Sequence, residues 1–145
     1  MATDRKATTV WTGDLFSGKG TTTFDSSGLA SDLPVSWPSR TEEPGGQTSP
    51  EELIAAAHSA CFSMALSNIL AKAGTPPERL ETSATVTFDT EGGPHISKIA
   101  LTVRGTVPGA DADAFAEAAN AAKDGCPVSK ALAGNVEMTV EATLA

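Results

Sequence analysis

The two cysteines are the residues of this chain with the most distinctive chemistry. Cys61 lies in an alanine-rich segment, and Cys126 directly precedes Pro127. Two thiols can form one structural disulfide, can be two inert buried side chains, or can form a redox pair. Residues 1–11 hold charged and threonine side chains where a signal peptide requires an apolar run, so we expect the protein to be cytoplasmic. In that reducing compartment, a bond between the cysteines would be transient rather than structural.

The positions of the two cysteines distinguish them. Cys61 lies about 15 Å from the start of a predicted helix, so the helix dipole supports its thiolate little and a nearby cation would have to activate it. Cys126 lies at a predicted helix start, where free backbone N–H groups favour a thiolate. The residues alone therefore favour Cys126 as the more reactive thiol. A free cysteine is also often a small buried hydrophobic residue, and this interpretation stays open for both.

One arginine and one glutamate could support a reactive thiol. Arg40 is the lone basic residue between positions 19 and 72, and a solvated surface arginine is the alternative interpretation. Glu52 fits the acidic position of a capping box that Ser49 opens, which leaves Glu51 without a structural role. An arginine that a carboxylate holds beside a cysteine would favour the thiolate. Arg40 and Glu51 are therefore candidate catalytic residues beside the two cysteines.

Glu51 and Cys61 cannot share a site within one copy of the chain. Ten residues of straight helix separate them by about 15 Å. If both act on one substrate, Glu51 is supplied by a second subunit. The small alanine side chains of this helix would allow close packing against a symmetry mate. We therefore expect an intertwined homodimer.

The two histidines suggest a metal site only weakly. His58 lies three residues before Cys61, so a Cys–His nucleophile pair, or a metal site with His95 and Cys126, can be drawn. The chain has no closely spaced Cys or His pair of the zinc-finger type, and a histidine in an alanine-rich helix is more often a packing residue. Glycine-rich nucleotide-binding motifs are also lacking. We expect neither a metal nor a bound cofactor.

Composition narrows the class of protein further. The chain has 18 acidic and 10 basic residues, a formal net charge of −8, and its basic residues are scattered. This pattern excludes a basic stripe for nucleic acid or acidic lipid. No apolar run approaches the roughly 18 residues of a membrane span. We expect one soluble domain over residues 1–145.

The spacing of apolar residues predicts an α+β fold with mainly antiparallel sheet. The segment after Ser49 is apolar or small on nearly all sides, so it should form a long, largely buried helix. The predicted elements are a hairpin over residues 8–24, a long loop over 25–48, a helix from 50 that ends at Gly74, strands over 82–89 and 99–107, helices from 111 or 113 to about 123 and from 126 to 134, and a strand over 136–142.

Two motifs carry a resemblance to a known family. The segment PEELIAAAHSACFSMALSNIL (residues 50–70), with CPVS (residues 126–129) downstream, resembles the OsmC/Ohr family of osmotically inducible and organic hydroperoxide resistance proteins. The segment AAHSACFSMALS is more similar in sequence to the OsmC branch than to the Ohr branch. The resemblance covers essentially the whole chain in element order. It implies an OsmC-like fold and an intertwined homodimer with active sites at the subunit interface.

The resemblance implies a thiol-dependent peroxidase without haem, flavin or metal. It makes Cys61 the peroxidatic and Cys126 the resolving cysteine, which reverses the order favoured by the helix-dipole argument. It makes Arg40 the activating arginine and Glu51 its partner. An organic hydroperoxide, or hydrogen peroxide, would be reduced through a Cys61 sulfenic acid and a Cys61–Cys126 disulfide, which an external dithiol then reduces.

The apolar surroundings of the helix, with Phe62 and Met64 near Cys61, favour an alkyl hydroperoxide over a strongly hydrated one. The alternative to an enzyme is a stress-related binding or structural protein on the same fold, in which the cysteines are buried and inert.

Overall fold

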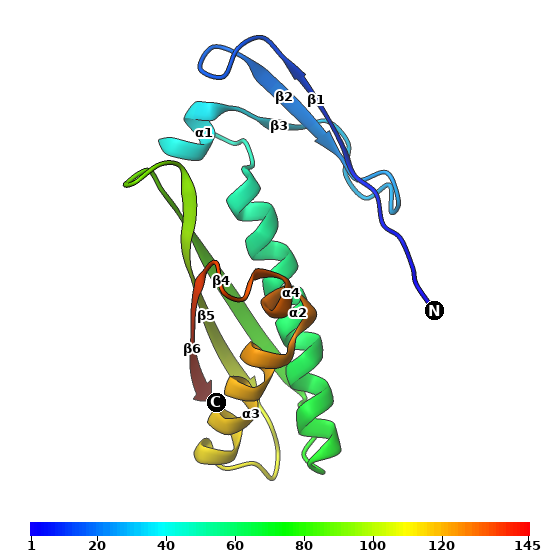
Figure 1. Ribbon diagram of the computed structural model, residues 1–145. Coiled ribbons are helices and arrows are strands. Elements are labelled where there is room, and N and C mark those ends of the chain that lie inside the picture. The colour runs from blue at the N-terminus through cyan, green and yellow to red at the C-terminus, as the bar shows by residue number, and fades with distance from the viewer. The chain divides into compact units, whose positions relative to one another are not determined.

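The computed structural model describes all 145 residues, which form two compact units over residues 1–50 and 51–145. The N-terminal unit holds an antiparallel sheet in the order β1-β2-β3, followed by one short helix (Figure 1). Its elements are β1 (Thr8–Thr12), β2 (Lys19–Thr23), β3 (Leu33–Val35) and α1 (Trp37–Thr41). The hairpin predicted over residues 8–24 is confirmed as β1 and β2.

The prediction of a long loop over residues 25–48 was wrong in part. This segment contains β3, which pairs with β2, and the helix α1. A reciprocal capping box starts α1, because the Ser36 hydroxyl accepts from the Ser39 N–H while the Ser39 hydroxyl accepts from the Ser36 N–H. Arg40 therefore lies in the last turn of a helix rather than on a loop.

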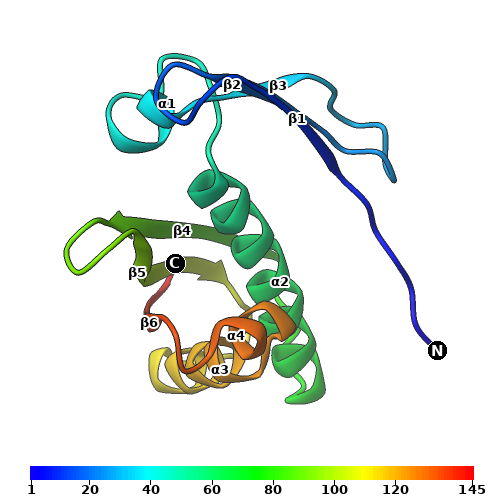
Figure 2. The ribbon, with the colours of Figure 1, turned by 45° about the horizontal axis from the view of Figure 1, so that its top comes forward.

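The C-terminal unit holds a second sheet in the order β4-β5-β6 and three helices. Strands β4 and β5 are antiparallel, whereas β6 runs parallel to β5. Helices α2 and α3 lie along one face of this sheet (Figures 1 and 2). The elements are α2 (Pro50–Lys72), β4 (Arg79–Asp89), β5 (His95–Thr106), α3 (Ala112–Gly125), α4 (Pro127–Leu132) and β6 (Glu137–Leu144).

Helix α2 begins at Pro50, as predicted, and Gly74 follows its end with a positive φ of 86°. The single chain buries one face of this helix rather than all sides. Four residues at a spacing of four, His58, Phe62, Leu66 and Leu70, form a buried stripe. By length and composition α2 could also cross a membrane, whereas the sequence analysis expected no segment apolar enough to do so. A core helix meets the same criterion, and Phe62, Leu66 and Leu70 of this stripe are part of the core.

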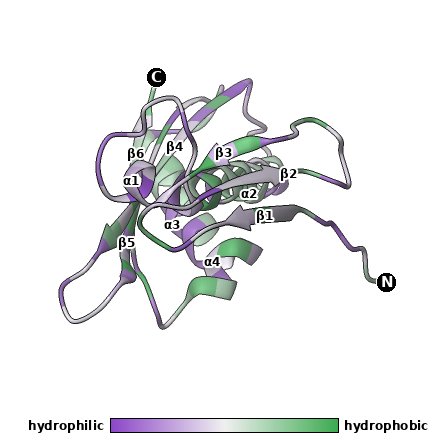
Figure 3. Ribbon diagram, turned by 90° about the horizontal axis from the view of Figure 1, so that it is seen from above, coloured by the Kyte–Doolittle hydropathy of each residue, from purple (hydrophilic) through white to green (hydrophobic).

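The core of the C-terminal unit joins α2 and α3 to the sheet. Alternate residues of β5 are buried against the helices, and hydrophobic and hydrophilic positions both occur along that strand (Figure 3). Asp111 caps α3 by accepting from the Ala114 N–H at 2.8 Å. Helix α3 ends at Gly125, and Cys126 is both its C-cap and the N-cap of α4, so the packing of α3 sets the position of this cysteine.

Candidate active site

The structure brings the two cysteines together. Cys61 lies midway along α2 and is partly exposed, whereas Cys126 lies between α3 and α4 and is fully buried. The Cys126 side chain lies close enough to Cys61 to raise the pKa of its thiol, although 65 positions of sequence separate them. Both are free thiols. This contact makes a redox pair geometrically feasible, which the sequence alone left open.

Burial raises the pKa of the Cys61 thiol above its usual value. The backbone N–H of Val128 opposes this shift, and the contact with Cys126 adds to it. Desolvation penalises the charged thiolate, which is the species that reacts. These surroundings favour the thiol form of Cys61. The folded protein therefore needs a cation to activate Cys61, as its distance from the helix start had already indicated.

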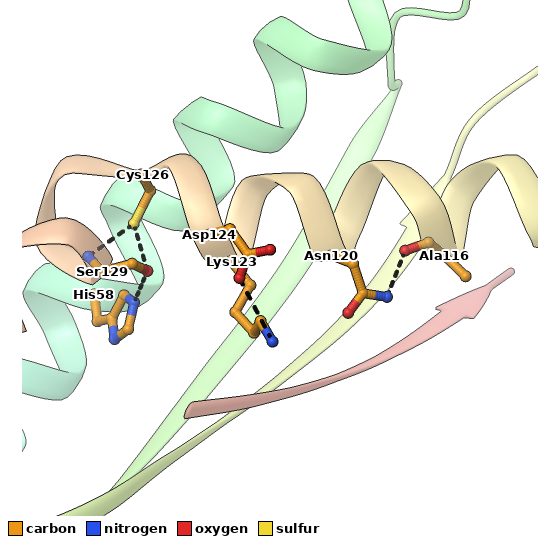
Figure 4. A network of polar contacts seen from close by, with 7 residues as sticks. All are labelled: His58, Ala116, Asn120, Lys123, Asp124, Cys126 and Ser129. Carbon is orange, nitrogen blue, oxygen red and sulfur yellow. Dashed lines mark hydrogen bonds and ion pairs between the residues drawn. The ribbon is translucent and has the colours of Figure 1, made fainter. Parts of the chain in front are cut away.

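Ser129 links Cys126 to a histidine that sequence analysis treated as a packing residue. The Ser129 N–H donates to Cys126 Sγ at 3.3 Å, and the Ser129 hydroxyl lies 3.1 Å from the same sulfur. That hydroxyl is also 2.8 Å from His58 Nε2. Figure 4 shows the Ser129 side chain between His58 and Cys126. The spacing of CPVS, with a serine three residues after a capping cysteine, could have indicated the first contact, but no local pattern indicates the second.

His58 is fully buried on α2. Desolvation lowers its pKa, so the neutral imidazole is favoured. Its Nδ1 atom has no hydrogen-bond partner, whereas Nε2 has Ser129. The ring is thus held by one nitrogen in a buried polar network of α2 and α4 residues.

Comparison with known proteins identifies the family. The sequence profile of the family described as OsmC-like protein matches residues 43–141. The chain belongs to the OsmC family. Peroxiredoxin OsmC of Escherichia coli (strain K12) is 43% identical over 139 residues, which cover 95% of this chain and 96% of that protein. The organic hydroperoxide resistance protein OhrB of Bacillus subtilis (strain 168) is 31% identical over 76% of this chain and 80% of its own length.

Solved structures agree with this OsmC assignment. The crystal structure of OhrB from Bacillus subtilis matches with a TM-score of 0.72 at 28% identity, over 95% of this chain and 98% of that chain. An OsmC-like protein from Mycoplasma pneumoniae matches with a TM-score of 0.74 over 99% of both chains, and at 17% identity it supports the fold alone. The predicted OsmC-like α+β fold is therefore confirmed.

The two charged candidates lie on different elements of this OsmC protein. Glu51, in the first turn of α2, is only 7% exposed, which is unusual for a carboxylate that serves a helix dipole alone. Glu52, the capping candidate, is exposed. Arg40 lies on α1 in the N-terminal unit, where its guanidinium carbon is 6.0 Å from the centroid of the Trp37 ring. The Phe16 ring packs nearly perpendicular to that same ring, at 87°, with centroids 5.9 Å apart.

Phe62 is fully buried in the core, whereas Met64 is 73% exposed, so only Met64 of this pair is open to a substrate. His58, His95 and the cysteines do not form a metal site, and no group of three or more His, Cys, Asp or Glu residues is placed to hold a metal ion.

Proposed function

We propose that this protein is a thiol-dependent hydroperoxide reductase that uses Cys61 and Cys126 as its redox pair. The observation that carries this proposal is the direct contact of the two thiols in a chain of the OsmC family. The names of its relatives, a peroxiredoxin and an organic hydroperoxide resistance protein, support the same reaction class. The chain spans most of the length of both relatives, so the proposal concerns a whole OsmC-like domain over residues 1–145.

The reaction has two oxidative steps and one reductive step. The Cys61 thiolate attacks the outer oxygen of the hydroperoxide, the O–O bond breaks, and the alkoxide leaves and takes up a proton to give an alcohol. Cys61 is then a sulfenic acid. Cys126 attacks the sulfur of this sulfenic acid, forming a disulfide and releasing water. An external dithiol exchanges with the disulfide and restores both thiols, so no bound cofactor is required.

Arg40 is proposed as the cation that activates Cys61, and Glu51 as the carboxylate that holds Arg40. The raised pKa of Cys61 supports the need for such a cation. The burial of Glu51 supports a role beyond the helix dipole. Because Glu51 and Cys61 are about 15 Å apart along α2, their joint action requires Glu51 of a second subunit.

A homodimer with active sites at its interface is therefore part of the proposal. The faces of α2 that the single chain leaves exposed or half-exposed carry small or apolar residues that a second copy could cover. They include Ala56, Ala57, Ala60 and Ala71. The other partners are a small hydroperoxide and a dithiol, and the acidic net charge of −8 argues against nucleic acid or an acidic membrane. The cytoplasm is the proposed location, where dithiol reductants are maintained.

An alkyl hydroperoxide is the proposed preferred substrate, with hydrogen peroxide as a poorer one. The exposed Met64, one helical turn from Cys61, offers an apolar contact that favours an alkyl group. Turnover of cumene hydroperoxide and hydrogen peroxide at equal concentrations tests this preference. Faster turnover of hydrogen peroxide would contradict it.

The proposed function is tested by peroxide consumption with a dithiol reductant. We expect Cys61→Ser to abolish consumption, and Cys126→Ser to form a sulfenic acid on Cys61 that dimedone traps. Ser59→Ala is a matched control, because the Ser59 hydroxyl donates only to the Ala56 carbonyl of its own helix. Undiminished consumption by Cys61→Ser would refute the enzyme and favour a non-catalytic protein.

A further inference from the structure

The proposed resolving cysteine has no direct access to solvent. Cys126 is 0% exposed, so neither water nor a dissolved base can reach its sulfur in this conformation. Its thiol must nevertheless lose a proton when it attacks a sulfenic acid, because the thiolate is the nucleophile. The proton therefore needs an acceptor inside the protein. Ser129 and His58 are the polar side chains that follow Cys126 in the buried network.

We propose that Ser129 and His58 form a proton relay that removes the proton of Cys126 during disulfide formation and returns it during reduction. This inference rests on the proposed function and deepens it. Ser129 contacts the reacting sulfur directly, whereas His58 acts through Ser129 and is a positioning residue. The relay joins α4 to α2 through two contacts of 3.1 Å and 2.8 Å.

The geometry supports both protonation states of Cys126. When Cys126 is a thiol, its S–H donates to the Ser129 oxygen and the Ser129 O–H donates to His58 Nε2. When Cys126 is a thiolate, the Ser129 O–H and the Ser129 N–H both donate to the sulfur, and His58 Nε2–H donates to the Ser129 oxygen. The heavy atoms keep their places, and only the two hydrogens move.

The step balances without another reactant. Cys126 Sγ bonds to Cys61 Sγ, the S–O bond of the sulfenic acid breaks, and the oxygen leaves with the electron pair as hydroxide. The proton of Cys126 passes to the Ser129 oxygen, and the hydroxyl proton of Ser129 passes to His58 Nε2. His58 later releases a proton to solvent, where it neutralises the hydroxide, so the net product is one water.

His58 suits the role of acceptor. It is fully buried, and Ser129 is the partner of its Nε2 atom. Burial lowers its pKa and keeps the resting ring neutral, so that it has a lone pair to offer. Its Nδ1 atom has no hydrogen-bond partner, which means that no neighbouring group fixes the ring in one protonation state.

The relay also has a route towards solvent. Ser129 borders a cavity of about 230 Å³ that Lys123 and Asp124 also line. These two charged residues pair with each other at 3.6 Å, between Lys123 Nζ and Asp124 Oδ1, and Asp124 is mostly exposed. Lys123 and Asp124 are the titratable residues that line this cavity with Ser129, whereas His58 and Cys61 are the titratable side chains in contact with Ser129 and Cys126. A proton held on His58 can thus return to the Ser129 oxygen and leave towards this cavity.

Rapid mixing with one equivalent of cumene hydroperoxide, followed by acid quench and mass spectrometry, separates the two oxidative steps. The loss of reduced Cys61 reports the first step, and conversion of sulfenic acid to disulfide reports the second. In Ser129→Ala and His58→Gln we expect the first rate to stay within about twofold of wild type and the second to fall by at least about tenfold. Ser129→Thr keeps the hydroxyl and should restore most of the second rate, and Ser59→Ala should change neither.

A pH profile distinguishes a relay from simple support of the fold. Between about pH 7 and 9 the wild-type rate of disulfide formation should be flat, because His58 is neutral throughout. In Ser129→Ala the rate should rise with pH, because without the relay Cys126 can lose its proton only to hydroxide, during transient opening of the site to solvent. Normal disulfide formation in both variants would overturn the inference and leave the proposed function intact. Failure of wild-type Cys61 to oxidise would refute the proposed function, and the inference with it.

Discussion

His58 should make the protein less stable below about pH 6.5, and the size of the effect follows from its burial. Desolvation lowers the pKa of the folded His58 from the ordinary value of 6.5. Above that pH both folded and unfolded chains carry a neutral imidazole, so there is no penalty. Below pH 6.5 the His58 imidazole binds a proton in the unfolded chain but stays neutral in the folded chain. The free energy of unfolding should then fall by at most about 1.4 kcal/mol per pH unit, or about 2 kcal/mol between pH 6.5 and pH 5.0.

Urea unfolding at about pH 7.5 and about pH 5.0 measures this loss in wild type and His58→Gln. Gln cannot titrate but can still reach Ser129, so the variant should lose less stability than wild type over this range, by up to about 2 kcal/mol. The carboxylates and the exposed His95 are common to both proteins and cancel in the difference. Far-UV circular dichroism is the suitable probe. Tryptophan fluorescence would report on residues 1–50, which hold both tryptophans, whereas His58 lies in the other unit. Equal losses in the two proteins would refute a neutral, buried His58.

Two other substitutions test the cation and the packing beneath the site. In a protein that keeps Cys61 as its only thiol, Arg40→Met should slow the alkylation of Cys61 by iodoacetamide at neutral pH by about tenfold or more. Arg40→Lys should slow it less. Equal rates with Arg, Met and Lys at position 40 would exclude Arg40 as the activating cation. Gly105→Ala should cost about 1–3 kcal/mol of stability in urea unfolding, because its Cβ would lie 2.5 Å from Cζ of the buried Phe115. Gly125→Ala, whose Cβ would meet nothing within 4 Å, is the control and should show no such loss.

The elements that the sequence predicted well have local causes. Pro50 and Gly74 delimit α2, and Asp111 caps α3, because these residues act within one helical turn. The alternation of β4 and β5 likewise depends on near neighbours. Cys126 at a helix start was also predictable, since Pro127 can occupy only the first turn of a helix.

The features that the sequence did not predict depend on distant residues. Strand β6 pairs with β5 in parallel because α3 and α4 carry the chain back across the sheet, and no pattern within β6 specifies this direction. The hydrogen bond from Ser129 to His58 joins residues 71 positions apart. The short elements β3 and α1 lie in a segment rich in serine and proline, where capping between Ser36 and Ser39 outweighs the composition.

For the candidate site, the sequence and the family resemblance named the two cysteines, and the fold brings them into contact. The direction of the Cys61 pKa shift follows from burial and could not be read from position along the helix. The roles of Arg40 and Glu51 remain predictions. Glu51 is about 15 Å from Cys61 along α2, so its role needs a contact that this helix does not provide, and Arg40 lies on a different helix, α1.

The most direct test of the central claim is to map the disulfide in wild-type protein after one equivalent of an organic hydroperoxide. Peptide mass spectrometry of the alkylated, unreduced digest should find Cys61 joined to Cys126 within one chain, in an amount that matches the peroxide consumed. Addition of a dithiol should restore both thiols. If peroxide is consumed while Cys126 remains a free thiol, the redox pair is wrong.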